Sequence, residues 1–171
     1  MIDYLSESFE NVVYYYFNYY HPVSGILEHL MRCLLQQLLG PLNHIPPIVE
    51  DFCQHAQCGQ PGPRTHEYIE MFIHVVTSIR STGSPVFVVL DGLDECSGSD
   101  VPRVAQTIEI LAENAIKVFV TSRPHISSLI KSLPSVSILA IDARADDIRH
   151  YSLHYGEAKG IKTTFHSSTN T

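Results

Sequence analysis

The sequence predicts an α/β protein in which a parallel sheet is covered by helices on both faces. Segments rich in β-forming residues alternate along the chain with segments whose apolar residues recur at helical spacing. The predicted strands are also continuous apolar runs, such as VFVVL at 86–90, rather than alternations of apolar and polar residues. Strands that are buried on both faces have this composition, and the strands of parallel sheets are buried in this way.

Length and composition fit one globular domain. The 171 residues are 44% hydrophobic and 17% charged, with a formal net charge of −7 and no basic run. An acidic chain of this kind argues against nucleic acid and against an anionic membrane as partners. No apolar stretch reaches the roughly 18 to 20 residues that a membrane helix needs, and the opening residues lack a signal-peptide pattern. With four cysteines and no secretory signal, we expect a cytoplasmic protein with reduced thiols.

The first part of the chain predicts a strand between two helices, followed by a loop. MIDYLSESFE has the spacing of the last turns of a helix, and NVVYYYFNYY is dense in β-formers and predicts a strand. A wide apolar stripe then predicts a helix over 26–39, with Ser24 as its N-cap. Residues 41–64 are rich in Pro, Gly, Gln and His, and they predict a loop that contains a short helical piece.

The second part continues the alternation of helices and strands. An apolar stripe predicts a helix over about 65–80, and the strand VFVVL follows it. Asp100 and Pro102 open another amphipathic helix, after which KVFV at 117–120 predicts a second buried strand. The elements expected further on are a short helix at 125–133, a strand at 135–141, a helix at 145–155 and a frayed tail at 160–171.

Polar residues suited to phosphate chemistry follow two of these strands. VFVVL is followed by DGLDE at 91–95, and KVFV is followed by TSR at 121–123. Ligands of open α/β sheets bind outside the carboxyl ends of the strands. If the two strands are parallel neighbours, three carboxylates and a guanidinium meet at one edge of the sheet. Mg²⁺ takes one or two carboxylates together with waters and phosphate oxygens, and arginine suits a transferring phosphoryl group.

A simpler interpretation treats the carboxylates as a helix cap or as solvated residues of a turn. For an isolated acidic strand end, that interpretation is the usual one. Here the apolar run, the D-x-x-D-E spacing and the matching S-R-P strand end occur together. Their combination favours a functional site.

VFVVLDGLDEC resembles the Walker B motif of NACHT nucleoside triphosphatases, which belong to the STAND class of P-loop proteins. KVFVTSRP is similar to their sensor 1 strand, and YYYFNYY with the helix after it resembles the elements that follow the P-loop helix. SILAIDARADDIRHY resembles the segment where the core passes into a helical subdomain. Within this group, the chain most resembles the fungal type of nephrocystin 3-like N-terminal domain, over about residues 1–155.

The resemblance implies a three-layer P-loop NTPase-type parallel sheet with helices on both faces, here without its first (P-loop) strand. It divides the chain into a partial core at 1–142, the start of a helical subdomain at 143–159 and an expected disordered tail at 160–171. It also implies a signalling NTPase that works as a nucleotide-dependent switch, with Mg²⁺ and ATP or GTP as cofactors. The implied partners are other proteins or further copies of the NACHT core, and ankyrin or other repeats accompany the domain in full-length relatives.

Carried over to this sequence, the resemblance assigns four residues to the site. Asp91 would hold Mg²⁺ through water, and Arg123 would contact the γ-phosphate of the nucleotide. Asp94 and Glu95 would position or activate the hydrolytic water, with Glu95 as the favoured base. Two supporting positions are Thr121 and Ser122.

The phosphate-binding loop G-x-x-x-x-G-K-[ST] does not occur in the sequence, and we expect the chain to begin a few turns after it. Each hydrogen bond to a charged group contributes about 1.5 to 3 kcal/mol, so losing three or four removes on the order of 5 kcal/mol or more. That loss weakens binding by about 10³ to 10⁴. We therefore expect residues 1–171 alone to bind no nucleotide tightly and to be inactive in hydrolysis. The alternative function is a non-catalytic, NTPase-like protein-interaction module.

Two further patterns favour structural interpretations. Cys53, His55 and Cys58, with His66, have the ligand types of a zinc site, but their spacing matches no common zinc pattern. The tyrosines of 14–20 lack the interleaved basic residues of a strand that binds nucleobases. We interpret the first set as loop residues and the second as a buried or edge strand.

Overall fold

The structure is a computed structural model that describes residues 2–9, 11–18, 25–57, 62–123, 137, 139 and 140. Residues Met1–Val136 form one compact unit, which contains every helix and strand of the described chain. Its elements are α1 (Ile2–Ser8), β1 (Val12–Tyr16), α2 (Ile26–Leu39), α3 (Pro47–Gln57), α4 (Thr65–Arg80), β2 (Phe87–Asp91), the 3₁₀ turn η1 (Leu93–Glu95), α5 (Val101–Glu113) and β3 (Lys117–Val120). None of the described helices is long and apolar enough to cross a bilayer.

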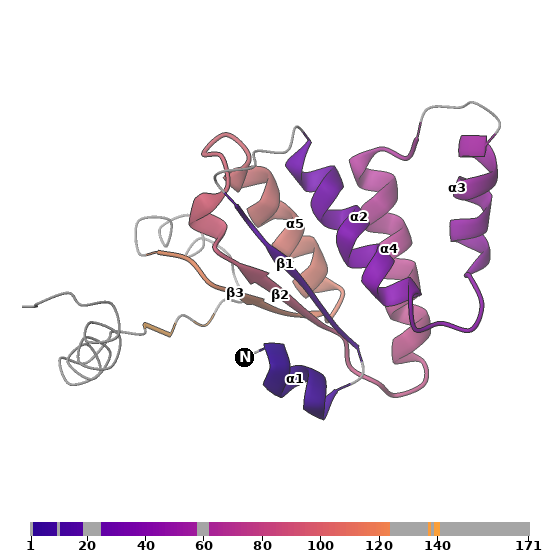
Figure 1. The fold of residues 1–171 in the computed structure, drawn as a ribbon, viewed down its shortest axis with the longest axis horizontal. Helices are drawn as coiled ribbons and strands as arrows, with labels where there is room; N and C mark the ends of the chain where they lie inside the picture. The colour runs from indigo at the N-terminus through magenta and orange to yellow at the C-terminus, as the bar shows by residue number, and fades with distance from the viewer. Residues whose placement is uncertain are drawn as a thin grey trace, which may run out of the picture. The chain divides into compact units, whose positions relative to one another are not determined.

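The three strands form one parallel sheet in the order β1-β2-β3 (Figure 1). Strand β2 is central, since Val88 pairs with Val13 on one side and with Val118 on the other. Because all three strands are parallel, their carboxyl ends meet at one edge of the sheet. The predicted α/β class is confirmed, and the two strands that end in polar residues are neighbours, as the site requires.

Helices cover both faces of the sheet. On one face, Val13 and Val88 belong to a large apolar core that they share with buried side chains of α2, α4 and α5. On the other face, Leu5 of α1 packs with Phe87 and Val89. Successive residues of β2 therefore enter different apolar layers, because side chains alternate across a strand. This arrangement explains why β2 is a continuous apolar run.

Several element boundaries differ from the predictions. Gly25, rather than Ser24, is the N-cap of α2, and its φ of 73° lies in the left-handed region that glycine adopts without strain. The short helical piece expected within 41–64 is an eleven-residue helix, α3. It starts at Pro47, and proline is favoured in the first turn of a helix. The strand predicted over 11–20 ends at Tyr16.

The elements expected after the second strand fall largely outside the described residues. This applies to the helices at 125–133 and 145–155 and to the tail at 160–171. Of the expected strand at 135–141, only Ser137, Leu139 and Ala140 are described, and none of the three lies in a strand.

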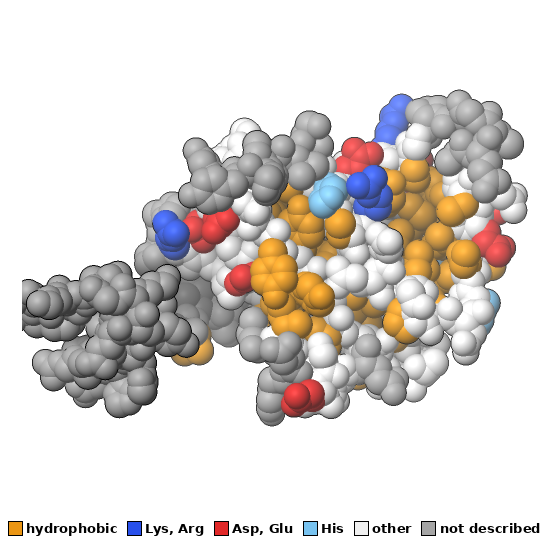
Figure 2. All heavy atoms as spheres, viewed as in Figure 1, with side chains coloured by type: hydrophobic (Ala, Val, Ile, Leu, Met, Phe, Trp, Pro, Cys, Tyr) orange, Lys and Arg blue, Asp and Glu red, His pale blue; other side chains and the backbone are white. Residues whose placement is uncertain are grey.

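A side chain of α2 covers the outer edge of β1. The Gln37 Nε2 donates a hydrogen bond to the Tyr14 carbonyl at 2.8 Å, and Gln37 Oε1 accepts one from the Tyr14 N–H at 3.0 Å. Tyr14 and Tyr16 of β1 are 40% and 55% exposed, and hydrophobic side chains gather on the face of the molecule drawn in Figure 2. Unpaired backbone groups at a sheet edge are a template for pairing with another chain. We infer that Gln37 protects an otherwise adhesive edge.

Substitution Gln37→Ala should increase self-association, because it exposes both backbone groups of Tyr14 beside an apolar surface. It should also lower the free energy of unfolding by about 1 kcal/mol, the usual contribution of such hydrogen bonds. Sedimentation velocity over a range of concentrations measures the first effect, and urea denaturation measures the second. Gln36→Ala, on the exposed side of the same helix, is the matched control. Equal self-association of the two variants would contradict the protective role of Gln37.

Candidate functional site

The chain turns sharply where β2 ends at Asp91. Gly92 has a φ of 72°, in the left-handed region, and this conformation directs the chain into the η1 turn. A Cβ added at Gly92 would lie 3.7 Å from the Phe17 carbonyl oxygen and 3.8 Å from the Glu95 side chain. Leu93 is fully buried and anchors the turn, so that Asp94 and Glu95 lie half-buried just beyond the end of β2.

Thr121, the first residue after β3, joins the two strand ends. Its hydroxyl donates a short hydrogen bond to Asp91 Oδ1 and accepts one from the Gly92 N–H at 2.9 Å. Two backbone hydrogen bonds add to this link. The Leu93 N–H donates to the Thr121 carbonyl at 3.0 Å, and the Thr121 N–H donates to the Leu90 carbonyl at 2.9 Å. The orientation of the Asp91 carboxylate is therefore set by β3 as well as by its own strand.

Arg123 contacts Asp94 at two points. The Arg123 N–H donates to Asp94 Oδ1 at 3.1 Å, and Arg123 Nε lies 3.2 Å from Asp94 Oδ2. The Asp94 side chain is 9% exposed, whereas that of Arg123 is 75% exposed. A carboxylate with so little access to water needs a partner, and Arg123 supplies it. Figure 2 shows basic and acidic side chains next to each other beside this turn.

The structure brings the four predicted site residues to the same edge of the sheet. Asp91 and Asp94 are tied to the end of β3, and Glu95 follows Asp94 on the same 3₁₀ turn. The Ser122 hydroxyl donates to the Arg123 carbonyl at 3.1 Å, which is a local contact.

The sequence predicted only a supporting role for Thr121, whereas in the structure its hydroxyl bonds directly to Asp91 and to Gly92. Sequence reasoning missed this role, because the hydroxyl meets Asp91 only through the register of β2 against β3. The available signal was its place directly after an apolar strand.

The donor set suits a cation that also takes oxygen ligands from water and phosphate. Among the described residues, no three His, Cys, Asp or Glu side chains converge to hold a metal by themselves. Mg²⁺ needs only one or two carboxylates, since waters and phosphates complete its octahedral shell. Asp91 fits this requirement, because Thr121 holds one carboxylate oxygen and so fixes the direction of the other. Of the zinc-like pattern, Cys53 lies exposed on α3, whereas the His55 side chain and Cys58 lie outside the described part of the chain.

Two weak acids near the turn, Cys96 and Tyr15, have raised pKa values. Burial raises the pKa of the Cys96 thiol, and the nearby Asp100 carboxylate raises it further, while a hydrogen bond from the Ser97 backbone lowers it less. Burial also raises the pKa of the Tyr15 hydroxyl, whose oxygen lies 3.0 Å from His29 Nδ1. Both groups are neutral at pH 7, so neither adds negative charge beside the acidic turn.

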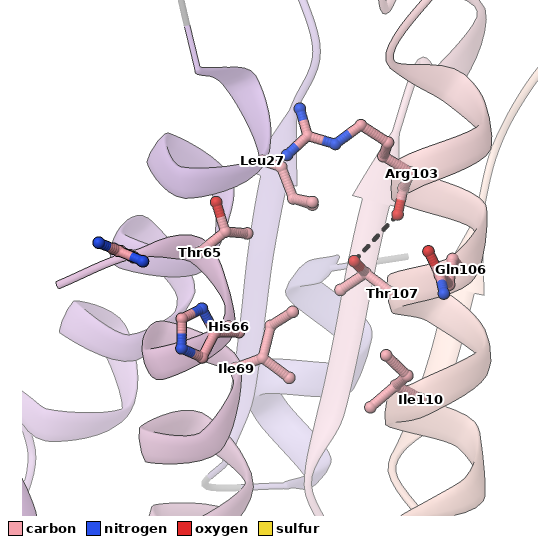
Figure 3. A pocket seen from close by; sticks show the side chains of 9 residues that line it. Leu27, Thr65, His66, Ile69, Arg103, Gln106, Thr107 and Ile110 are labelled. Atoms are coloured by element: carbon pink, nitrogen blue, oxygen red, sulfur yellow. Dashed lines mark hydrogen bonds between the residues drawn. The ribbon is translucent and has the colours of Figure 1, made fainter.

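A second concave feature lies in the helical layer. A cavity of about 400 Å³ opens between the first turns of α2 and α4 and the first three turns of α5 (Figure 3). Its apolar lining comes from Leu27, Ile69 and Ile110. The Thr107 hydroxyl in its wall donates to the Arg103 carbonyl at 3.0 Å, so this polar group is satisfied within α5. None of the four predicted site residues lines the cavity.

The fold and the edge together define an α/β protein whose parallel sheet presents carboxylates and an arginine at its carboxyl end. A family model described as Nephrocystin 3, N-terminal matches residues 1–123. The match covers well over half of the 171 residues and includes both strand ends, so the chain belongs to the nephrocystin 3 N-terminal family. Neither the search of curated proteins nor the search of solved structures returned a match.

Cys96 should be alkylated more slowly than Cys53. Cys96 is buried and its pKa is raised, so less of it is thiolate at pH 8, whereas Cys53 is exposed on α3. Because the thiolate is the reactive form, we expect iodoacetamide to modify Cys96 at least about ten times more slowly. Timed quenching followed by peptide mass spectrometry measures both rates, and the two should converge in denaturant. Similar rates in the folded protein would mean that the turn after β2 opens readily.

Proposed function

We propose that residues 91–95 and 121–123 form the magnesium and water side of a nucleotide site of the NACHT type. The observation that carries the proposal is the hydrogen-bonded link through Thr121, which joins the Walker B-like turn to the sensor 1-like strand end. A site that handles a phosphoryl group needs its cation ligand and its arginine at fixed separation, because positioning and electrostatic stabilisation supply most of the catalysis.

Each residue of this edge has a proposed role. Asp91, oriented by Thr121, would hold Mg²⁺ through water. When bound, the ion neutralises charge on the phosphate oxygens. Glu95 would orient the attacking water and accept its proton, as carboxylates do in general base catalysis, with Asp94 beside it on the turn. Arg123 would contact the γ-phosphate, since a guanidinium fork matches phosphate oxygens.

We further propose that the edge is only one half of such a site. The sequence contains no G-x-x-x-x-G-K-[ST], which is the segment that grips the phosphates. Residues 1–171 by themselves should therefore bind Mg-ATP or Mg-GTP weakly and hydrolyse it negligibly. In this proposal the domain belongs to a cytoplasmic signalling protein whose nucleotide state controls its contacts with other proteins or with further copies of itself.

A second candidate is a non-catalytic protein-interaction module. It is favoured by the aromatic side chains that remain exposed on the sheet, which are Tyr14, Tyr16 and Phe119. Exposed apolar patches commonly mark protein contacts. In that case, association with partners would not depend on Asp91.

Mn²⁺ binding to the chain tests the proposed metal role of Asp91. Mn²⁺ substitutes for Mg²⁺ and its free form is measured directly by electron paramagnetic resonance. We expect a dissociation constant on the order of a millimolar, because few protein ligands are available. Asp91→Asn should weaken binding at least about fivefold through the loss of one negative charge beside the ion.

Asp51→Asn provides the matched control, since it removes the same charge from the exposed surface of α3. Its Mn²⁺ affinity should stay at the wild-type value. Equal affinities of the Asp91 variant and the wild type would refute the metal role. Calorimetric titration of Mg-ATP into the same wild-type chain measures its affinity for the nucleotide. A low-micromolar dissociation constant would contradict the half-site proposal.

A further inference from the structure

Both oxygens of Asp94 are engaged by one residue. Oδ1 accepts the Arg123 N–H at 3.1 Å, and Oδ2 lies 3.2 Å from Arg123 Nε. The family resemblance gives Asp94 a role beside the attacking water. Because both Asp94 oxygens already accept from Arg123, this carboxylate is better placed to hold Arg123 than to orient a water. The two contacts fix the backbone and the side chain of Arg123 together.

The exposure of the two partners is unequal, and this asymmetry is informative. Asp94 is 9% exposed, so Arg123 supplies the compensation that water supplies to other carboxylates. Arg123 is 75% exposed and meets Asp94 Oδ2 through Nε, and a guanidinium carries five N–H donors. At 75% exposure the Arg123 side chain is accessible to solvent while its Nε is held by Asp94. Arg123 can thus keep its position and still meet an anion.

We propose that Asp94 is a positioning residue that holds Arg123 at the sheet edge as the built-in counter-ion of the acidic turn. The proposal rests on the function proposed above, in which this edge binds a divalent cation through Asp91. The Asp94–Arg123 pair contributes no net charge to that site. Asp91 then determines the cation affinity, and Arg123 is ready for a phosphate group that arrives with the ion.

A charge cycle follows from this arrangement. Removing the charge of Arg123 leaves Asp94 uncompensated and makes the edge more negative, so a cation should bind more tightly. Removing the charge of Asp94 leaves the positive charge of Arg123 uncompensated and should weaken cation binding. Removing both charges restores the neutral balance of the pair. If Asp94 were itself a cation ligand, the double variant would instead bind as weakly as the Asp94 variant.

The test measures Mn²⁺ affinity by electron paramagnetic resonance for the full chain and three variants. We expect Arg123→Gln to tighten binding about three- to tenfold and Asp94→Asn to weaken it by a similar factor, as expected for charges several ångströms apart near water. The Mn²⁺ affinity of the double variant should lie within about twofold of the wild-type value, because the two charge changes offset each other. Arg80→Gln is the matched control, because its guanidinium donates to the Asn114 carbonyl at 2.9 Å, away from the site, and its loss changes the net charge equally.

Two outcomes would overturn the inference: an Arg123→Gln variant that binds no more tightly than Arg80→Gln, or a double variant as weak as Asp94→Asn. If Asp94→Asn fails to fold, Arg123→Lys replaces it. That variant keeps the charge and should bind Mn²⁺ like the wild type, and tightening equal to that of Arg123→Gln would refute the counter-ion role. A different result would refute the proposed function itself, namely an Asp91→Asn variant with unchanged Mn²⁺ affinity.

Discussion

The Thr121 hydroxyl is the contact on which the geometry of the sheet edge depends. It holds Asp91 Oδ1 and the Gly92 N–H at once, and it comes from a different strand from both. The backbone hydrogen bonds of Leu93 and Thr121 also join the turn to the end of β3, but they do not fix the direction of the Asp91 carboxylate. With the hydroxyl in place, the turn and the end of β3 form one hydrogen-bonded unit. A polar group of this kind is effective here because partly buried polar groups must be satisfied, and one hydroxyl satisfies a donor and an acceptor.

The unit follows a completely buried stretch of β2. Val88, Val89 and Leu90 are at most 1% exposed, and they lie between two strands and two helical layers. Close packing leaves such a strand little freedom, so residues at its end inherit a fixed position. The outer parts of the sheet differ in this respect, since Tyr14 of β1 and Phe119 of β3 remain 40% and 39% exposed. The sheet thus combines a buried central strand, which positions charge, with outer strands whose aromatic side chains remain partly exposed.

Much of this arrangement was predictable from local patterns. The stripes of α4 and α5 and the apolar runs of β2 and β3 indicate their elements, because burial imposes a period on each of them. The acidic strand end and the arginine of the next strand predicted a common edge, and the parallel pairing of β2 with β3 confirms it. The Asp94–Arg123 pair was not predictable, since the two residues are 29 positions apart and their contact depends on register and on the turn at Gly92. Helix α3 was underestimated because its Pro- and Gln-rich surroundings resemble a loop, whereas Val49, Ile48 and Phe52 pack against the core.

Paramagnetic broadening by Mn²⁺ in a ¹⁵N-labelled sample of the chain tests the central claim most directly, namely that the acidic turn and the end of β3 form one cation-binding unit. At substoichiometric Mn²⁺, we expect the amide signals of residues 91–95 and of 121–123 to broaden together and before all others. The joint loss of the two groups is expected because the Thr121 hydroxyl keeps both within the reach of one ion. Broadening that begins at other acidic surfaces, such as those of α3 or α5, and spares the end of β3 would contradict the claim.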